Sequence, residues 1–149
     1  MLSENQQAPD FTLPSTSGED FTLSKSAKNK PIVIYFYPKD NTRVCTLEAC
    51  AFRDRFDHLR ALDIEVVGIS TDSIKKHLNF KKEHHLPFEL LSDRNGKVSK
   101  LYRAYVPIIG ISQRITYLLD KEHRVKLAIK DHFNASKHLK AVIEESTKL

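Results

Sequence analysis

Glycine is scarce in this sequence: only four of its 149 residues are glycine, and each stands apart from the others, at positions 18, 68, 96 and 110. Glycine-rich loops that cradle phosphates and the fingerprint of dinucleotide-binding folds both need closely spaced glycines. The sequence therefore contains neither motif, and we expect no nucleotide cofactor.

Long hydrophobic runs are also missing. The longest, residues 32–36, is far shorter than the roughly 20 apolar residues that a membrane helix needs. The first twenty residues contain four acidic groups and no apolar stretch, unlike a signal or transit peptide. We therefore expect a soluble cytoplasmic protein that has no membrane partner.

Cysteine occurs only twice, as Cys45 and Cys50. A chain of this length can bury one sizeable core, so we expect a single domain over residues 1–149 that needs no disulfide or metal to fold. In the cytoplasm, such a pair is more often redox-active or reduced than a permanent cross-link.

Charge of one sign is not concentrated anywhere. The 24 basic and 19 acidic residues give a net charge of +5, but the lysines are dispersed among acidic residues. A nucleic-acid-binding module is the alternative for a basic chain, and it would bind DNA in a salt-dependent way. Because the sequence shows no aromatic RNA platform or recognition-helix pattern, we expect a solvated basic surface and no nucleic-acid partner.

What the chain does have is an alternation of strand-like and helix-like segments. Residues 31–37 form a β-branched and aromatic run without polar alternation, which is typical of a strand buried on both faces. The remaining pattern predicts strands at 64–71, 88–91, 114–119 and 124–129, and helices at 46–60, 73–85, 97–102 and after the capping residue Asn134. This order predicts an α/β fold in which helices flank both faces of a central mixed sheet.

The junction between the first long strand and the first helix carries both cysteines. In open α/β sheets, binding crevices lie at the carboxyl ends of the strands, where this junction would sit. We place Cys45 in the first turn of the helix, where free N–H groups and the helix dipole favour a thiolate. Arg43 adds positive charge nearby, and the Thr42 hydroxyl could donate to the sulfur. A lone cysteine is more often a small buried hydrophobe, but this context favours a nucleophile.

The same junction resembles the peroxiredoxins, and among them the bacterioferritin-comigratory or Q-type subgroup. Pro38, Thr42 and Cys45 match the family pattern Pro-x-x-x-Thr-x-x-Cys, and Cys50 matches the second cysteine of the subgroup. Further similarity follows in order along the chain, at residues 8–13, 68–72, 90–93 and 114–120.

The resemblance implies a thioredoxin-like fold and the reduction of hydrogen peroxide or organic hydroperoxides without a metal or a bound cofactor. Cys45 would be the peroxidatic cysteine and Cys50 the resolving one, with recycling by thioredoxin or a similar dithiol. Thr42 and Arg114 would be polar partners of the sulfur, and Pro38 would shield it. We expect the protein to act as a monomer.

One departure from the subgroup concerns Arg43 and Val44, which stand where its members usually have Pro-Gly. A charged and a β-branched residue should stiffen and crowd the approach to the cysteine. The resemblance therefore says less about substrate preference than about reaction type.

Three other interpretations carry less weight. His77, His84 and His85 lie roughly on one helical face but two turns apart, so we interpret them as surface histidines rather than metal ligands. Glu144 and Glu145 fit a solvated helix face better than a catalytic acid/base pair. A thiol-disulfide reductase is the nearest rival function, but such enzymes usually use Cys-x-x-Cys, whereas four residues separate these cysteines.

Overall fold

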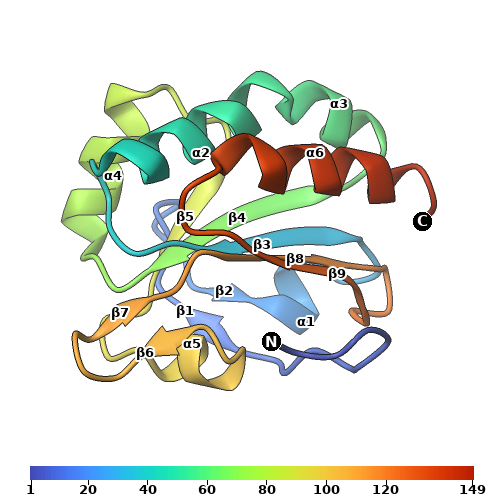
Figure 1. The fold of residues 1–149 in the computed structure, drawn as a ribbon, viewed down its shortest axis with the longest axis horizontal. Coiled ribbons are helices and arrows are strands. Elements are labelled where there is room, and N and C mark those ends of the chain that lie inside the picture. Colours follow the sequence, from blue (N-terminus) through green and yellow to red (C-terminus); the bar gives the residue numbers. More distant parts are fainter.

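The computed structural model describes all 149 residues. Its centre is a sheet of five strands, β3 (Ile32–Phe36), β4 (Glu65–Ser70), β5 (Glu89–Ser92), β8 (Ile115–Leu119) and β9 (Val125–Lys130). They lie in the order β5-β4-β3-β8-β9 (Figure 1). β3, β4 and β5 are parallel, whereas β8 runs antiparallel to both β3 and β9. The predicted mixed sheet is therefore confirmed.

The central position of β3 in the sheet explains its sequence. All five of its residues are buried, because β4 and β8 pair with its two edges and both faces of the sheet are covered. Ile32, Ile34 and Phe36 enter one core cluster, while Val33 and Tyr35 enter the other. A strand in this position has no solvent-facing side, which accounts for the absence of polar alternation.

Helices lie on both faces of the sheet, as predicted. They are α1 (Leu23–Ser26), α2 (Arg43–Asp54), α3 (Phe56–Ala61), α4 (Ile74–Glu83), α5 (Lys97–Leu101) and α6 (Ala135–Ser146). Figure 1 shows α2, α3 and α6 above the sheet and α1 and α5 below it. Phe80 of α4 packs in the same cluster as Phe52 of α2 and Val142 of α6, so α4 belongs to the upper layer.

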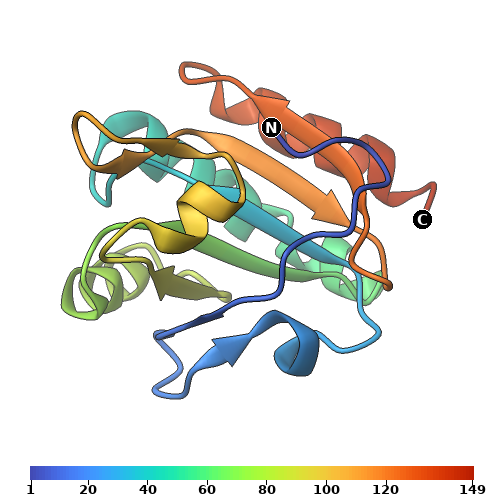
Figure 2. The ribbon, with the colours of Figure 1, turned by 90° about the horizontal axis from the view of Figure 1, so that it is seen from below.

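Two small antiparallel pairs complete the lower face, where Figure 2 shows them beside α1 and α5. They are β1 (Thr12–Leu13) with β2 (Phe21–Thr22), and β6 (Tyr105–Val106) with β7 (Ile111–Ser112). Two-residue strands are too short to show a period, which is why the sequence did not predict them. No helix of the protein has the length and apolar character needed to cross a membrane.

Two helix predictions need correction. The helix expected at 46–60 begins earlier, at Arg43, and divides at Arg55 into α2 and α3. In α4, His77 was expected at the surface but is buried together with Phe80, whereas Leu78 is 45% exposed. Apolar spacing marked the helix correctly but could not identify a histidine as its inward-facing residue.

Candidate active site

Cys45 lies where the sequence placed it, at the carboxyl edge of the sheet and in the first turn of a helix. It is the third residue of α2, which begins directly after the loop that follows β3. The side chain is 1% exposed and packs in the core cluster between the sheet and the upper helices. Backbone N–H groups in the first turn have no partner within the helix, so this position favours negative charge on the sulfur.

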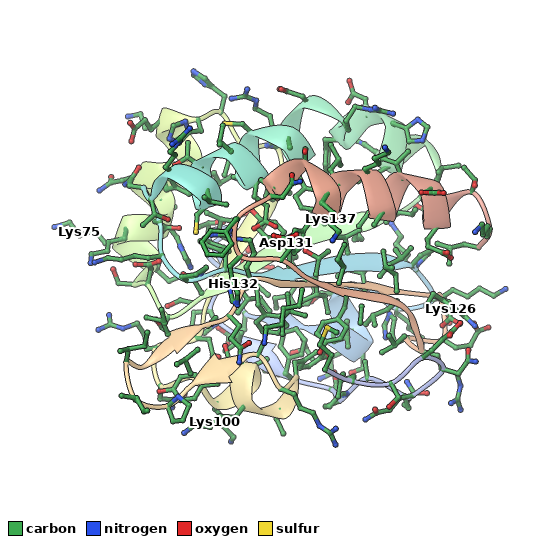
Figure 3. All side chains as sticks on the ribbon, in the orientation of Figure 1. Lys75, Lys100, Lys126, Asp131, His132 and Lys137 are labelled. Atoms are coloured by element: carbon green, nitrogen blue, oxygen red, sulfur yellow. The ribbon has the colours of Figure 1, made fainter.

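Arg114 contacts this sulfur directly. Its Nη2 atom donates to Cys45 Sγ at 3.1 Å, and its Nη1 atom donates to Glu48 Oε1 at 2.9 Å. The Nε atom donates to the carbonyl of His132 at 3.2 Å. His132, which is labelled in Figure 3, lies between β9 and α6. Three anchored nitrogens in a side chain that is 4% exposed fix the guanidinium in place.

The strand order explains how Cys45 and Arg114, which are 69 positions apart in the chain, come into contact. Ile115 pairs with Phe36, the last residue of β3, in the antiparallel ladder between β3 and β8. Arg114, one residue before Ile115, therefore lies beside the carboxyl end of β3, where the loop to α2 begins. The sequence placed Arg114 at a strand start, and only the strand order brings it to Cys45.

Glu48 is a member of this site that the sequence reasoning missed. It lies three residues after Cys45, on the same side of α2, and its side chain is fully buried. Burial raises the pKa of Glu48 to about 7, although the charge and hydrogen bond of Arg114 act in the opposite direction. The other carboxylate oxygen, Oε2, has no hydrogen-bond partner. A glutamate one turn beyond the cysteine, in an otherwise apolar sector, was the signal that could have revealed it.

His138 of α6 closes the site from above and was also missed. Its Nε2 atom lies 2.9 Å from the carbonyl oxygen of Asp131 and therefore donates to it, while the Thr116 hydroxyl lies 2.7 Å from Nδ1. Nδ1 also lies 3.5 Å from Glu48 Oε2. Burial lowers the pKa of His138, and the nearby Arg114 charge lowers it further. This direction favours the neutral imidazole, in which Nε2 carries the proton and Nδ1 accepts a hydrogen bond from the Thr116 hydroxyl.

The other predicted site residues are placed less directly. The Thr42 hydroxyl donates to the carbonyl of Lys39 at 2.8 Å rather than to the sulfur. Thr42 and Arg43 are both exposed, and Pro38 is half-buried at the start of the loop. The structure therefore joins Cys45 to Arg114, and it places Thr42 and Pro38 on the loop that leads to them.

Cys50 lies on the same helix as Cys45, and both thiols are free. Its side chain is half-buried, whereas that of Cys45 is buried. Five residues along a regular helix place two Cα atoms roughly 8.6 Å apart on different faces. A disulfide needs less than about 7 Å between Cα atoms, so the two cysteines cannot bond while α2 is intact.

A buried polar cluster beneath the loop corrects the interpretation of His77 as a surface residue. His77 is fully buried, with Nδ1 at 2.6 Å from Asp40 Oδ2 and Nε2 at 2.9 Å from the carbonyl of Leu91. The hydroxyl of Tyr37 donates to Asp40 Oδ1, and the backbone N–H of Asp40 donates to Asp72. The cluster connects the loop before Cys45 to α4 and β5, so the role of His77 is to hold that loop in place.

A buried cysteine in the first turn of a helix, in contact with an arginine, is an arrangement suited to thiol chemistry. The chain belongs to the AhpC/TSA family, whose model matches residues 5–128. It is 42% identical over 149 residues to the chloroplastic peroxiredoxin Q of Populus jackii, covering 99% of this chain and 68% of that protein. It is 44% identical over 128 residues to a putative peroxiredoxin of Coxiella burnetii, covering 81% of this chain and 83% of that protein.

Solved structures agree with these relatives. The peroxidoxin BcpB of Mycobacterium tuberculosis superimposes with a TM-score of 0.93 at 28% identity, over 100% of this chain and 99% of that one. Peroxiredoxin Q of Xanthomonas campestris gives a TM-score of 0.84 at 28% identity, over 93% and 90% of the two chains. The protein is a thiol-dependent peroxidase with a thioredoxin-like fold, and the predicted fold and family are confirmed.

Proposed function

We propose that Cys45 is the peroxidatic cysteine of this peroxidase and that Cys50 resolves its oxidised form. The observation that carries the proposal is the 3.1 Å contact between Arg114 Nη2 and Cys45 Sγ at the start of α2. A fixed guanidinium stabilises a thiolate and also the negative charge that develops on the departing oxygen. No other thiol in the chain has such a partner.

In the first step, the Cys45 thiolate attacks the terminal oxygen of a hydroperoxide. An S–O bond forms, the O–O bond breaks, and the remaining oxygen leaves as water or an alcohol after taking up a proton. Cys45 is thereby oxidised to a sulfenic acid while the peroxide is reduced by two electrons. Thr42 and Pro38 lie on the loop before Cys45, where we assign them to the peroxide pocket as polar partner and shield.

In the second step, the Cys50 thiol attacks the sulfur of the sulfenic acid. A Cys45–Cys50 disulfide forms and water leaves, so no other oxidant is needed. Because the intact helix holds the two cysteines apart, α2 must open locally before this bond can form. A dithiol protein such as thioredoxin then reduces the disulfide and restores both thiols, and the intramolecular bond lets the enzyme work as a monomer.

Mass spectrometry of one tryptic peptide tests the assignment. Cleavage after Arg43 and Arg53 releases residues 44–53, which contain both cysteines. After one equivalent of peroxide without reductant, this peptide should be lighter by two hydrogens. The Cys45→Ser variant should consume no peroxide, and Cys50→Ser should stop after one turnover unless a small thiol is added.

Two other results would redirect the assignment. A covalent dimer through Cys45 would show that the resolving thiol comes from a second chain. Reduction of disulfide substrates without any consumption of peroxide would favour a thiol-disulfide reductase instead.

A further inference from the structure

A polar pocket of about 270 Å³ lies beside the loop that leads to Cys45. It follows the carboxyl ends of the three parallel strands β3, β4 and β5, because its walls are formed by residues that come directly after each of them. This edge of an open α/β sheet is where such folds bind ligands. The residues that define this basic pocket are Pro38 and Lys39 after β3, residues 71–73 after β4, Lys76 of α4, Arg94 after β5, and Ile111 of β7.

The basic pocket carries unpaired positive charge. Lys39, Lys76 and Arg94 all line it, and none of the three forms an ion pair. The only acidic residue in the wall is Asp72, whose Oδ2 atom accepts hydrogen bonds from the Asp40 backbone and from the Ser70 hydroxyl. Since that carboxylate is 7% exposed and bonded within the protein, the cations have no partner of their own.

The start of α4 strengthens the preference for an anion. Ser73 caps this ten-residue helix, and both Ser73 and Lys76 line the basic pocket. The positive end of the helix dipole therefore adds to the charge of the side chains. The preference for an anion therefore comes from three unpaired cations in the basic pocket and not from the helix end alone.

Pro38 connects the basic pocket to the reaction, because it lines the pocket and also begins the motif that ends at Cys45. A ligand anchored by these cations would lie next to the peroxidatic loop. The walls offer little apolar surface beyond Pro38 and Ile111, so a long alkyl chain would bury little there. The opening therefore suits a short chain that ends in an anion.

We infer that the basic pocket binds the carboxylate of short-chain hydroperoxides and so makes them preferred substrates. This inference rests on the proposed role of Cys45 as the peroxidatic residue. Lys76 of α4 and Arg94 after β5 would hold the carboxylate while the hydroperoxide end reaches past Pro38 to the sulfur.

A pair of matched substrates tests the inference. The probes are a terminal hydroperoxypentanoic acid and its methyl ester, which differ in charge but have the same reacting group. For the unmodified enzyme, kcat/KM should be higher for the acid, and the ratio of acid to ester should fall as salt is added. Lys76→Ala and Arg94→Ala should each lower this ratio by about 3-fold, and the double variant by on the order of 10-fold.

Lys75→Ala is the matched control, because Lys75 is the neighbouring exposed lysine and projects away from the protein in Figure 3. It should leave the ratio unchanged. A direct measurement uses pentanoate, which cannot react: it should shift the backbone amide resonances of residues 71–76 in a saturable way, whereas pentanol should not.

An unchanged ratio in the double variant would overturn the inference. So would a double variant in which only the KM for a dithiol protein rises, since the pocket would then bind the reductant. Failure of the proposed function looks different, because Cys45→Ser would then still consume both the acid and the ester.

Discussion

Glu48 Oε2 lies 3.5 Å from His138 Nδ1 and has no hydrogen-bond partner, although both side chains are fully buried. Nδ1 of the neutral histidine is an acceptor, so an ionised Glu48 faces a lone pair across this gap. A proton on Glu48 removes this repulsion, since Nδ1 already accepts a hydrogen bond from the Thr116 hydroxyl. The two residues therefore favour a proton on the carboxyl group, in the same direction as burial.

The first prediction concerns the pH dependence of stability. The pKa of Glu48 is raised from 4.5 to about 7 in the folded protein, so the folded state keeps a proton that the unfolded state loses. Stability should therefore fall as pH rises from about 4.5 to about 7 and level off above that range, by on the order of 3 kcal/mol from this group.

Urea unfolding of the reduced protein across this pH range measures the effect. Glu48→Gln should flatten its part of the slope, because the amide does not titrate. Glu83→Gln, which changes an exposed carboxyl group at the end of α4, should keep the slope. Equal slopes in the two variants would remove Glu48 as the source.

The second prediction concerns Arg114. Because it donates to the Cys45 sulfur from a fixed position, Arg114→Ala should lower the second-order rate with hydrogen peroxide by on the order of 10²-fold. Stopped-flow measurement of Cys45 oxidation gives this rate without the later steps. Arg103→Ala, at an exposed arginine, is the control. Full activity in Arg114→Ala, with an unchanged circular dichroism spectrum, would show that the contact has no catalytic effect.

The fold could be predicted because its elements have strong local patterns. The run at residues 31–37 has no polar alternation, and β3 is buried on both faces as a result. Asn134 was predicted to cap the last helix, and its side chain accepts the Lys137 N–H. These features depend on neighbouring residues in the chain, so the sequence alone reveals them.

The site could be predicted only in part, because its partners are distant in sequence. The loop motif identified Cys45, but Glu48 is bound by Arg114, 66 residues away, and His138 reaches Glu48 only because α6 packs over α2. His77 was taken for a surface residue because histidine is usually at least partly exposed. His77 is buried because Asp40, on the loop after β3, provides a buried hydrogen-bond partner for its ring. The apolar periodicity of the helix contains no information about a partner elsewhere in the chain.

The third prediction follows from this buried pair. His77→Ala removes one partner and leaves the Asp40 carboxyl group buried with less compensation, so it should destabilise the protein by roughly 3–5 kcal/mol. His58→Ala, at an exposed position of α3, should change stability by less than about 0.5 kcal/mol. The midpoints of urea unfolding compare the two. Similar midpoints would mean that the Asp40–His77 contact contributes little to holding the loop.

The last prediction concerns the opening of α2. The Cys45–Cys50 disulfide cannot form within a regular helix, so the oxidised protein should have lost helical hydrogen bonds around residues 45–50. Amide hydrogen exchange in this segment should then be faster by on the order of 10-fold or more than in the reduced protein, because locally unfolded segments exchange at the fast end of the range. Exchange in β3, buried in the centre of the sheet, should not change.

Cys50→Ser treated with one equivalent of peroxide separates the two chemical steps, since it can form the sulfenic acid but not the disulfide. It should keep slow exchange through α2, and adding a dithiol to the oxidised parent protein should restore slow exchange. If α2 exchanges as slowly in the disulfide form as in the reduced protein, the helix does not open and another thiol must resolve Cys45.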